Sequence, residues 1–401
     1  MKKITLFLVL WVSVFSVFSQ SSFSMEEVVR YLASPELEGR KIQTKGDTLA
    51  REYLVNQFEN MGLMPFYSQY APPFCTRSIF TAIQNEMCSN NVIAFVEGTD
   101  AKLKEQYILV CAHFDHVGTA KNVYFAGAND NASGTATVLY LADYFAKNPL
   151  KRSIIFACFA GEESGMLGSN NFIKTFPEPL NNIKYVINFD MVGRYDDGGL
   201  CLMGKESSKI LETTVKKESK KEKITVNKSA SLFFVGSDHY PFYLKNIPVL
   251  CFNTGNDLKN YHTPRDKAER IDFAGMETIA GFAKEVVTEL GNNPKDPVFK
   301  KMDETNIKKD NAKMMWEFML ANPNKFGFEF DREECGNEIE ITKTTKKGEE
   351  AGLLVGDIVI KINNKPFECS MDFMELVKSE KEKPYKVTVV RNGEEMVVEV
   401  N

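Results

Sequence analysis

The sequence predicts an α/β domain built on a mostly parallel, doubly wound sheet with helices on both faces, followed by a small β-rich domain. Short runs that are apolar throughout recur in the first two thirds of the chain, as expected for strands covered on both faces. Segments with helical spacing alternate with these runs, and such alternation is typical of parallel sheets. The runs span residues 92–96, 107–111, 154–159, 185–189 and 247–252.

Five segments are predicted to form helices beside these strands. Residues 47–61 carry apolar residues at helical spacing and end at Gly62, which favours helix termination. The other four span residues 132–147, 167–175, 207–217 and 273–290. Residues 293–324 are charged, interrupted by prolines and poorly periodic, which predicts a linker with one short helix.

The N-terminus has the pattern of a secretory signal peptide. Lys2 and Lys3 precede an apolar run at residues 4–18, which is too short for a stable membrane span. We expect cleavage before Gln20 and a secreted or periplasmic protein without a membrane span. Removal of residues 1–19 lowers the basic count from 49 to 47 against 54 acidic residues, which leaves a net charge of −7. This balance argues against a nucleic-acid partner.

The length predicts more than one hydrophobic core. Without the signal peptide, roughly 380 residues remain, more than one core usually organises. We therefore expect a large domain at residues 20–292, the linker at 293–324 and a second domain at 325–401. The apolar fraction of 43% is sufficient for two cores.

The eight cysteines predict one disulfide. Cys75 and Cys88 flank an irregular segment rich in Pro, Phe and Asn, and they form the candidate pair. In contrast, Cys111, Cys158 and Cys251 lie inside apolar runs and are expected to be buried thiols.

Side chains able to bind a metal follow the predicted strands. The chain has four histidines, and each lies after a strand or in a loop beside acidic residues. Ligands of doubly wound sheets gather at the carboxyl ends of the strands. The motifs, in chain order, are His113-Phe-Asp115-His116, Gly127-Ala-Asn-Asp130-Asn-Ala-Ser-Gly134, Gly161-Glu162-Glu163, Asn188-Phe-Asp190, Ser237-Asp238-His239 and Tyr261-His262. Histidine and carboxylate ligands favour zinc, and a catalytic zinc site also leaves a position for water.

These motifs, in this order, resemble the co-catalytic zinc aminopeptidase family, which also holds glutamate carboxypeptidase-like enzymes and glutaminyl cyclases. The resemblance covers about residues 25–290 and includes LASPELEGR at residues 32–40. It implies two zinc ions bridged by Asp130, a cis peptide bond after Asp130 and a general base at Glu162. The implied ligands are His113 and Asp190 at one ion, and Glu163 and His262 at the other.

Spacing assigns a further role near the metals. Residues two apart in an extended segment point the same way, so Asp115 is expected to reach the ring of His113 and fix its tautomer. Adjacent Glu162 and Glu163 cannot project identically from one strand end, which suits one as ligand and the other as base.

Three aromatic side chains near the metals have more than one interpretation. In some members of the resembled family a tyrosine precedes the zinc histidine, so Tyr261 is a candidate donor to the oxyanion of a tetrahedral intermediate. The alternative is a packing aromatic beside the metal. For His116 the alternatives are lining the cleft and a structural role, and for His239 a structural role is capping the helix that begins near Tyr240. We expect structural roles for both.

The C-terminal segment resembles a PDZ domain. Phe326-Gly327-Phe328 is similar to the loop whose backbone N–H groups bind a peptide carboxylate, and Leu353-x-x-Gly356-Asp357 is similar to the turn into a central strand. The resemblance implies binding of a peptide C-terminus as an added strand. The alternative is a β-rich module that only packs on the large domain.

We therefore expect a secreted di-zinc aminopeptidase that removes N-terminal residues from peptides with a free N-terminus. Two alternatives use the same site. A single-zinc glutaminyl cyclase is one, although such relatives usually have tryptophan where this chain has Tyr261. A dipeptidase or carboxypeptidase is the other, with Arg194 holding a substrate carboxylate. A receptor-like scaffold without metals is disfavoured because all five ligands and the base are present.

Overall fold

The computed structural model describes most of the chain. The predicted signal peptide and most of the predicted linker, with its short helix, lie outside the described residues. None of the described helices is long and apolar enough to cross a membrane. The described residues are 23–77, 86–120, 123–195, 199–227, 235–255, 260–303, 323–330, 339–367, 370–381 and 383–401.

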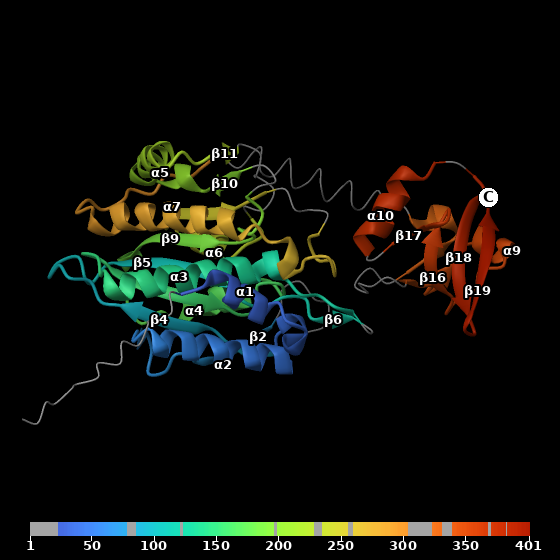
Figure 1. Cartoon of the computed structure of the whole chain (residues 1–401), viewed down its shortest axis with the longest axis horizontal. Helices are drawn as coiled ribbons and strands as arrows, with labels where there is room; N and C mark the ends of the chain where they lie inside the picture. Colours follow the sequence, from blue (N-terminus) through green and yellow to red (C-terminus); the bar gives the residue numbers. More distant parts are fainter. Residues whose placement is uncertain are drawn as a thin grey trace, which may run out of the picture.

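An eight-stranded mixed sheet forms the centre of the large domain (Figure 1). Its four middle strands, β8, β5, β9 and β12, run parallel, as predicted. The edges differ from the prediction, because β4 pairs antiparallel with β8 and β10 pairs antiparallel with β12. In sheet order the strands are β1 (Met64–Pro65), β4 (Val92–Val96), β8 (Ser153–Phe159), β5 (Tyr107–His113), β9 (Ile183–Phe189), β12 (Val249–Asn253), β10 (Leu200–Met203) and β11 (Val226–Asn227).

Helices cover both faces of this sheet. Successive side chains of a strand point to opposite faces, so Ile108 and Val110 of β5 belong to one buried cluster and Leu109 and Cys111 to the other. The first cluster is completed by α1 (Met25–Leu32), α2 (Lys45–Asn60), α3 (Gly134–Lys147), α5 (Lys209–Lys221) and α7 (Phe273–Asn292). The second is completed by α4 (Leu167–Thr175) and α6 (His239–Tyr243). The predicted fold class is therefore confirmed.

A disulfide joins the hairpin of β2 (Pro73–Arg77) and β3 (Glu86–Asn90). Cys75 and Cys88 face each other in its register and are bonded, as predicted. The predicted thiols Cys111, Cys158 and Cys251 are free and buried. A second small hairpin consists of β6 (Thr119–Ala120) and β7 (Val123–Tyr124).

The described residues from 323 to the C-terminus, here called the C-terminal module, have a buried cluster of their own. All of its side chains come from Phe326 to Val400. The strands are β13 (Phe328–Glu329), β14 (Ile339–Glu340), β15 (Lys343–Thr344), β16 (Ile358–Ile362), β17 (Lys365–Pro366), β18 (Tyr385–Arg391) and β19 (Glu394–Val400), and the helices are α9 (Lys346–Ala351) and α10 (Ser370–Ser379). The PDZ-like resemblance and the domain boundaries stay predictions.

Arg152 ties the start of β8 to the segment that follows α7. Its side chain is fully buried and donates to the carbonyls of Leu290 and Asn293 and to the side chain of Gln106. Asp296, which is half exposed, lies 3.3 Å from its guanidinium. A buried guanidinium that satisfies backbone carbonyls fixes the position of that segment.

Replacing Arg152 should destabilise the large domain. Arg152→Met leaves these acceptors buried without donors, and we expect the free energy of unfolding to fall by about 2–4 kcal/mol. Urea denaturation followed by circular dichroism measures this change. Lys184→Met is the matched control, because Lys184 pairs with the same half-exposed Asp296 but donates to no buried carbonyl in the described part of the chain, and this change should cost less than Arg152→Met. Equal losses in both variants would contradict the role given to Arg152.

Candidate metal centre

The carboxyl ends of the parallel strands carry the predicted site. His113 is the last residue of β5, Asp190 follows β9 directly, and Glu162 and Glu163 lie three and four residues after β8. Because these strands are neighbours in the sheet, their ends meet at one edge. Asp130 comes from the turn before α3, and His262 from the loop after β12.

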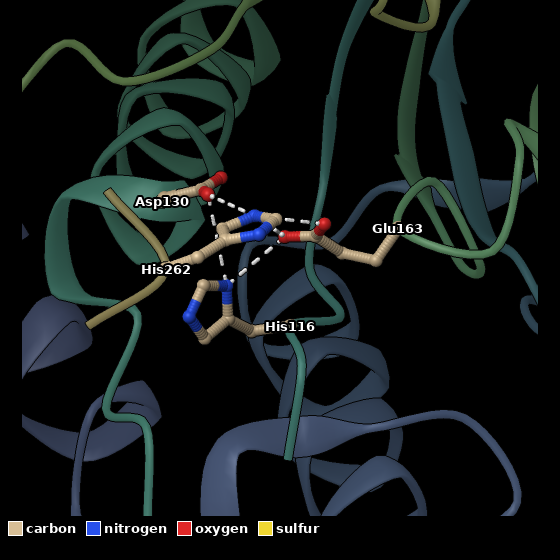
Figure 2. A group of neighbouring side chains, drawn as sticks. All are labelled: His116, Asp130, Glu163 and His262. Carbon is tan, nitrogen blue, oxygen red and sulfur yellow. Dashed lines mark hydrogen bonds and ion pairs between the residues drawn. The ribbon is translucent and has the colours of Figure 1, made fainter. Parts of the chain in front are cut away.

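One group of metal-binding side chains contains His116, Asp130, Glu163 and His262, and Figure 2 shows them converging. The Nε2 atom of His262 lies 3.2 Å from Asp130 Oδ2 and 3.0 Å from Glu163 Oε2. His116 Nδ1 lies 3.1 Å from Glu163 Oε1 and 3.7 Å from Asp130 Oδ2. The structural role predicted for His116 is therefore incomplete, because its ring faces two predicted ligands.

A second group contains His113, Asp130 and Asp190. His113 Nε2 lies 3.4 Å from Asp130 Oδ1 and 3.6 Å from Asp190 Oδ1. Asp130 is thus common to both groups, with Oδ1 toward His113 and Oδ2 toward His262. This is the arrangement that a bridging carboxylate requires.

Asp115 acts differently from the prediction. The backbone carbonyl of Asp115, at 3.2 Å, is nearer to His113 Nδ1 than its carboxylate, at 3.7 Å. The carboxylate instead accepts the backbone N–H groups of Glu162 at 3.1 Å and Glu163 at 3.4 Å. Asp115 therefore fixes the short loop that presents the two glutamates as well as facing the histidine ring.

The neighbouring glutamates have opposite electrostatic environments. Burial raises the pKa of Glu162 well above its usual value, because the charged form loses hydration. Burial acts in the same direction on Glu163, but the charge of His262 and hydrogen bonds from His116 and His262 lower its pKa to about 2. Two carboxyls with separated pKa values suit different tasks. Glu163 suits a permanently charged ligand and Glu162 suits a proton acceptor.

The turn that presents Asp130 is held by its neighbours. The Asp130–Asn131 peptide bond is cis, as the resemblance implied. The Asn131 side chain accepts from the N–H of Gly134 at 2.9 Å and donates to the carbonyl of Phe189 at 2.9 Å. A Cβ at position 134 would lie 2.3 Å from both Asn131 Oδ1 and the Phe189 oxygen, so the close approach requires glycine.

Asp266 was missed by sequence reasoning, although it lies four residues after His262. Its carboxylate accepts the N–H groups of Asn129 at 2.8 Å and Asp130 at 2.9 Å, and its carbonyl accepts that of Ala128 at 3.1 Å. Three successive N–H groups of one turn therefore bind one buried residue. Asp266 joins the loop of His262 to the turn of Asp130.

Arg40 supplies a buried positive charge behind the same turn. Its guanidinium donates to the carbonyls of Leu32, Phe114, Ala126 and Gly127. Burial lowers the pKa of Arg40 to about 10, so it stays charged at neutral pH. In the sequence, the signal for Arg40 is that it ends the LASPELEGR motif at residues 32–40, which is part of the family resemblance.

The remaining candidate residues lie at or near the site. Tyr261 stacks on His262, with ring centroids 3.9 Å apart. His239 begins α6 and is fully buried, which fits the predicted structural role. Arg194 donates to the carbonyl of Arg270 at 2.6 Å, so at least part of its guanidinium is engaged within the protein.

The donor set fits bound cations. Asp115, Asp130, Glu162, Glu163 and Asp190 are buried or nearly so around two groups of imidazole nitrogens. Like charges in a buried site repel, and burial of carboxylates is costly without compensating charge. Asp130 Oδ2 is also buried and has no hydrogen-bond partner among the described residues. A buried carboxylate oxygen within 3.7 Å of two imidazole nitrogens is suited to zinc.

Residues 91–287 match the sequence profile of Peptidase family M28. The α/β domain belongs to this family.

Curated relatives agree with an M28 assignment. The chain is 27% identical over 219 residues to aminopeptidase YwaD of Bacillus subtilis. The aligned residues make up 52% of this chain and 46% of that protein. The chain is 29% identical over 164 residues to the alkaline phosphatase isozyme conversion protein of Escherichia coli, covering 38% and 46%. The chain thus spans about half the length of these relatives.

Solved structures share the M28 fold. BSAP, a zinc aminopeptidase from Bacillus subtilis, matches with a TM-score of 0.55 and 16% identity, covering 70% of this chain and 99% of that chain. A glutaminyl cyclase from Fimbriiglobus ruber matches with a TM-score of 0.55 and 19% identity, covering 66% and 94%. At these identities the likeness shows the fold alone.

Changing Asp266 should weaken this M28 metal centre without removing a ligand. Asp266→Asn turns one acceptor oxygen into an amide that faces a backbone N–H. We expect unfolding free energy to fall by about 1–3 kcal/mol and zinc affinity to fall about tenfold or more, as for other supporting residues. Competition with a chromogenic chelator measures the affinity. Asp272→Ala removes a carboxylate that accepts the Gly275 N–H at the start of α7, and it should lower stability alone. Unchanged zinc affinity in Asp266→Asn would refute the positioning role.

Proposed function

We propose that this protein is an exported zinc aminopeptidase with two metal ions per chain. The observation that carries the proposal is Asp130, whose two carboxylate oxygens face separate groups of metal-binding side chains. His113 and Asp190 would hold one zinc ion, and Glu163 and His262 would hold the other. His116 contacts Glu163 and Asp130, two residues that would hold the second ion. When bound, the zinc ions polarise the scissile carbonyl and lower the pKa of the attacking water.

Glu162 is the general base of this reaction. It accepts a proton from the attacking water and returns it to the nitrogen of the departing amine as the peptide bond breaks. Burial raises the pKa of Glu162, and cations bound beside it would favour the charged form and lower that pKa toward the working range. Asp115 positions the glutamate through its backbone N–H.

Tyr261 donates to the oxyanion of the tetrahedral intermediate. Burial, together with the charges of Glu163 and Asp130, raises the pKa of Tyr261 well above its usual value, which supports a protonated phenol. Its stacking on His262 places the ring beside the metal centre.

The aminopeptidase mode is supported over a carboxypeptidase by two observations. The relatives YwaD and BSAP are named aminopeptidases. Arg194, the candidate for a substrate carboxylate, is directed to the carbonyl of Arg270. The substrates are peptides with a free N-terminus.

The location and the C-terminal module complete the proposal. Export is supported by the signal-peptide pattern and by the Cys75–Cys88 disulfide, since disulfides persist in oxidising compartments. The module binds a peptide C-terminus near Phe326 and Phe328. Gly327 between them has a positive φ of 97°, and its N–H donates to the Asn324 carbonyl at 3.0 Å, so the proposal rests on the resemblance of this segment to a carboxylate-binding loop.

Metal analysis tests the two-ion proposal against a single-zinc glutaminyl cyclase. Protein purified without chelator should contain about two zinc ions per chain and release nitroaniline from aminoacyl-nitroanilides. A reproducible content near one ion, with cyclisation of glutaminyl peptides and no release of nitroaniline, would favour the cyclase. The Fimbriiglobus ruber likeness makes this the relevant second candidate.

Substitution of each glutamate separates base from ligand. Glu162→Gln keeps the size of the side chain but cannot accept a proton, so kcat should fall by roughly 10²- to 10⁴-fold with zinc affinity nearly unchanged. Glu163→Gln should weaken the binding of one zinc ion, and this variant should regain part of its activity in excess zinc. Steady-state kinetics across a zinc titration distinguishes the two. If excess zinc restored the activity of Glu162→Gln and not that of Glu163→Gln, the two roles would be reversed.

A further inference from the structure

An ion pair joins the C-terminal module to the large domain. Arg265 Nη1 donates to Asp372 Oδ2 at 2.6 Å, and Arg265 Nη2 donates to Asp372 Oδ1 at 2.8 Å. The two residues are 107 positions apart, and their side chains are only 23% and 21% exposed. Two parallel bonds between a guanidinium and a carboxylate fix orientation as well as distance, so this is a specific contact.

On the module side, the contact is made by a residue of a helix that packs into the core of the module. Asp372 lies in the first turn of α10, and its neighbour Phe373 is fully buried in the core of the module. Val377, one turn later, belongs to the same core. In Figure 1, α10 lies on the side of the module that faces the large domain. The N-terminus of a helix also favours a negative side chain.

On the other side Arg265 belongs to the loop that carries His262 and Asp266. This loop, residues 260–268, is here called the His262 segment. It is a tight turn, because Thr263 N–H donates to the Asn260 carbonyl at 3.1 Å and Asp266 N–H donates to the Thr263 carbonyl at 3.2 Å. The Arg265 N–H also donates to Thr263 Oγ1 at 3.2 Å. These hydrogen bonds connect Arg265 to both ends of the turn, so a displacement of Arg265 would also displace those ends.

Two residues of the His262 segment, His262 and Asp266, contact the metal centre. His262 contributes an imidazole 3.2 Å from Asp130 Oδ2. Asp266 binds the N–H groups of Asn129 and Asp130, which shape the turn that presents the shared carboxylate. Arg265 lies between these two residues in the sequence, so the ion pair anchors the segment at its middle.

We propose that the C-terminal module docks on the His262 segment through the Arg265–Asp372 ion pair and so strengthens metal binding at the group of His116, Asp130, Glu163 and His262. This inference rests on the proposed metal centre. The module is then a part of the support of the catalytic site in addition to any peptide that it binds. The pair is charged and partly solvated, so docking weakens as ionic strength rises.

The test uses the full-length chain with four variants. Arg265→Gln and Asp372→Asn each break the pair, and the double variant Arg265→Asp with Asp372→Arg restores it in reverse. Arg391→Gln is the matched control, because Arg391 forms a two-bond pair with Asp357 inside the module. Zinc affinity is measured by chelator competition, and the radius of gyration of the zinc-free chain by X-ray scattering.

Each single variant should bind zinc about three- to tenfold more weakly, a change expected for one well-formed ion pair, and should increase the radius of gyration. The reversed pair should recover both values to within about twofold, whereas Arg391→Gln should leave zinc affinity unchanged. Single variants that bind zinc as the wild type does would overturn the proposal, and so would failure of the reversed pair to recover. A wild-type chain that takes up no zinc would overturn the proposed function, and the scattering would still decide whether the module docks.

Discussion

The concentration of buried carboxylates around Asp130 is the constraint on which the rest of the site depends. Asp115, Asp130 and Glu163 lie close together with limited access to water. In such a place negative charge is unfavourable unless hydrogen bonds and positive charge compensate it. The protein supplies backbone N–H groups, imidazoles and the Arg40 guanidinium, and the grouping of buried carboxylates with imidazoles around Asp130 is suited to bound cations that complete the balance.

The same constraint explains why so many backbone contacts surround the site. A carboxylate shared between two groups must keep both oxygens in fixed directions. Asp266 and Asn131 hold the turn of Asp130 from opposite ends, one through N–H groups and the other through the end of β9. Rigid support of this kind keeps ligands in place without strain at the metal. Neighbouring Glu162 and Glu163 can then differ in function because their surroundings differ.

The ion pair at Arg265 connects this support to a part of the chain with a separate core. The loop of His262 therefore has three sets of contacts, with the Asp130 turn, with Glu163 and with α10. A metal centre held in this way depends on both parts of the protein. Domains joined by small polar contacts usually retain relative motion. Because salt weakens the ion pair, a rise in ionic strength is expected to weaken metal binding as well.

The sequence by itself determined the central strands, most of the helices beside them and the side chains at the strand ends, because periodicity and strand boundaries are local properties of the chain. The helix α1 was not predicted. The motifs around His113, Asp130 and Glu163 also located the site through a family resemblance. Only the tertiary structure decided the antiparallel edges of the sheet, the contact of His116 with Glu163, and the roles of Asp266 and Arg265. Asp266 and Asp130 are 136 residues apart, and Arg265 and Asp372 are 107 apart. No local pattern specifies such partners, because each contact exists only after separate loops have been brought to the same edge of the folded sheet.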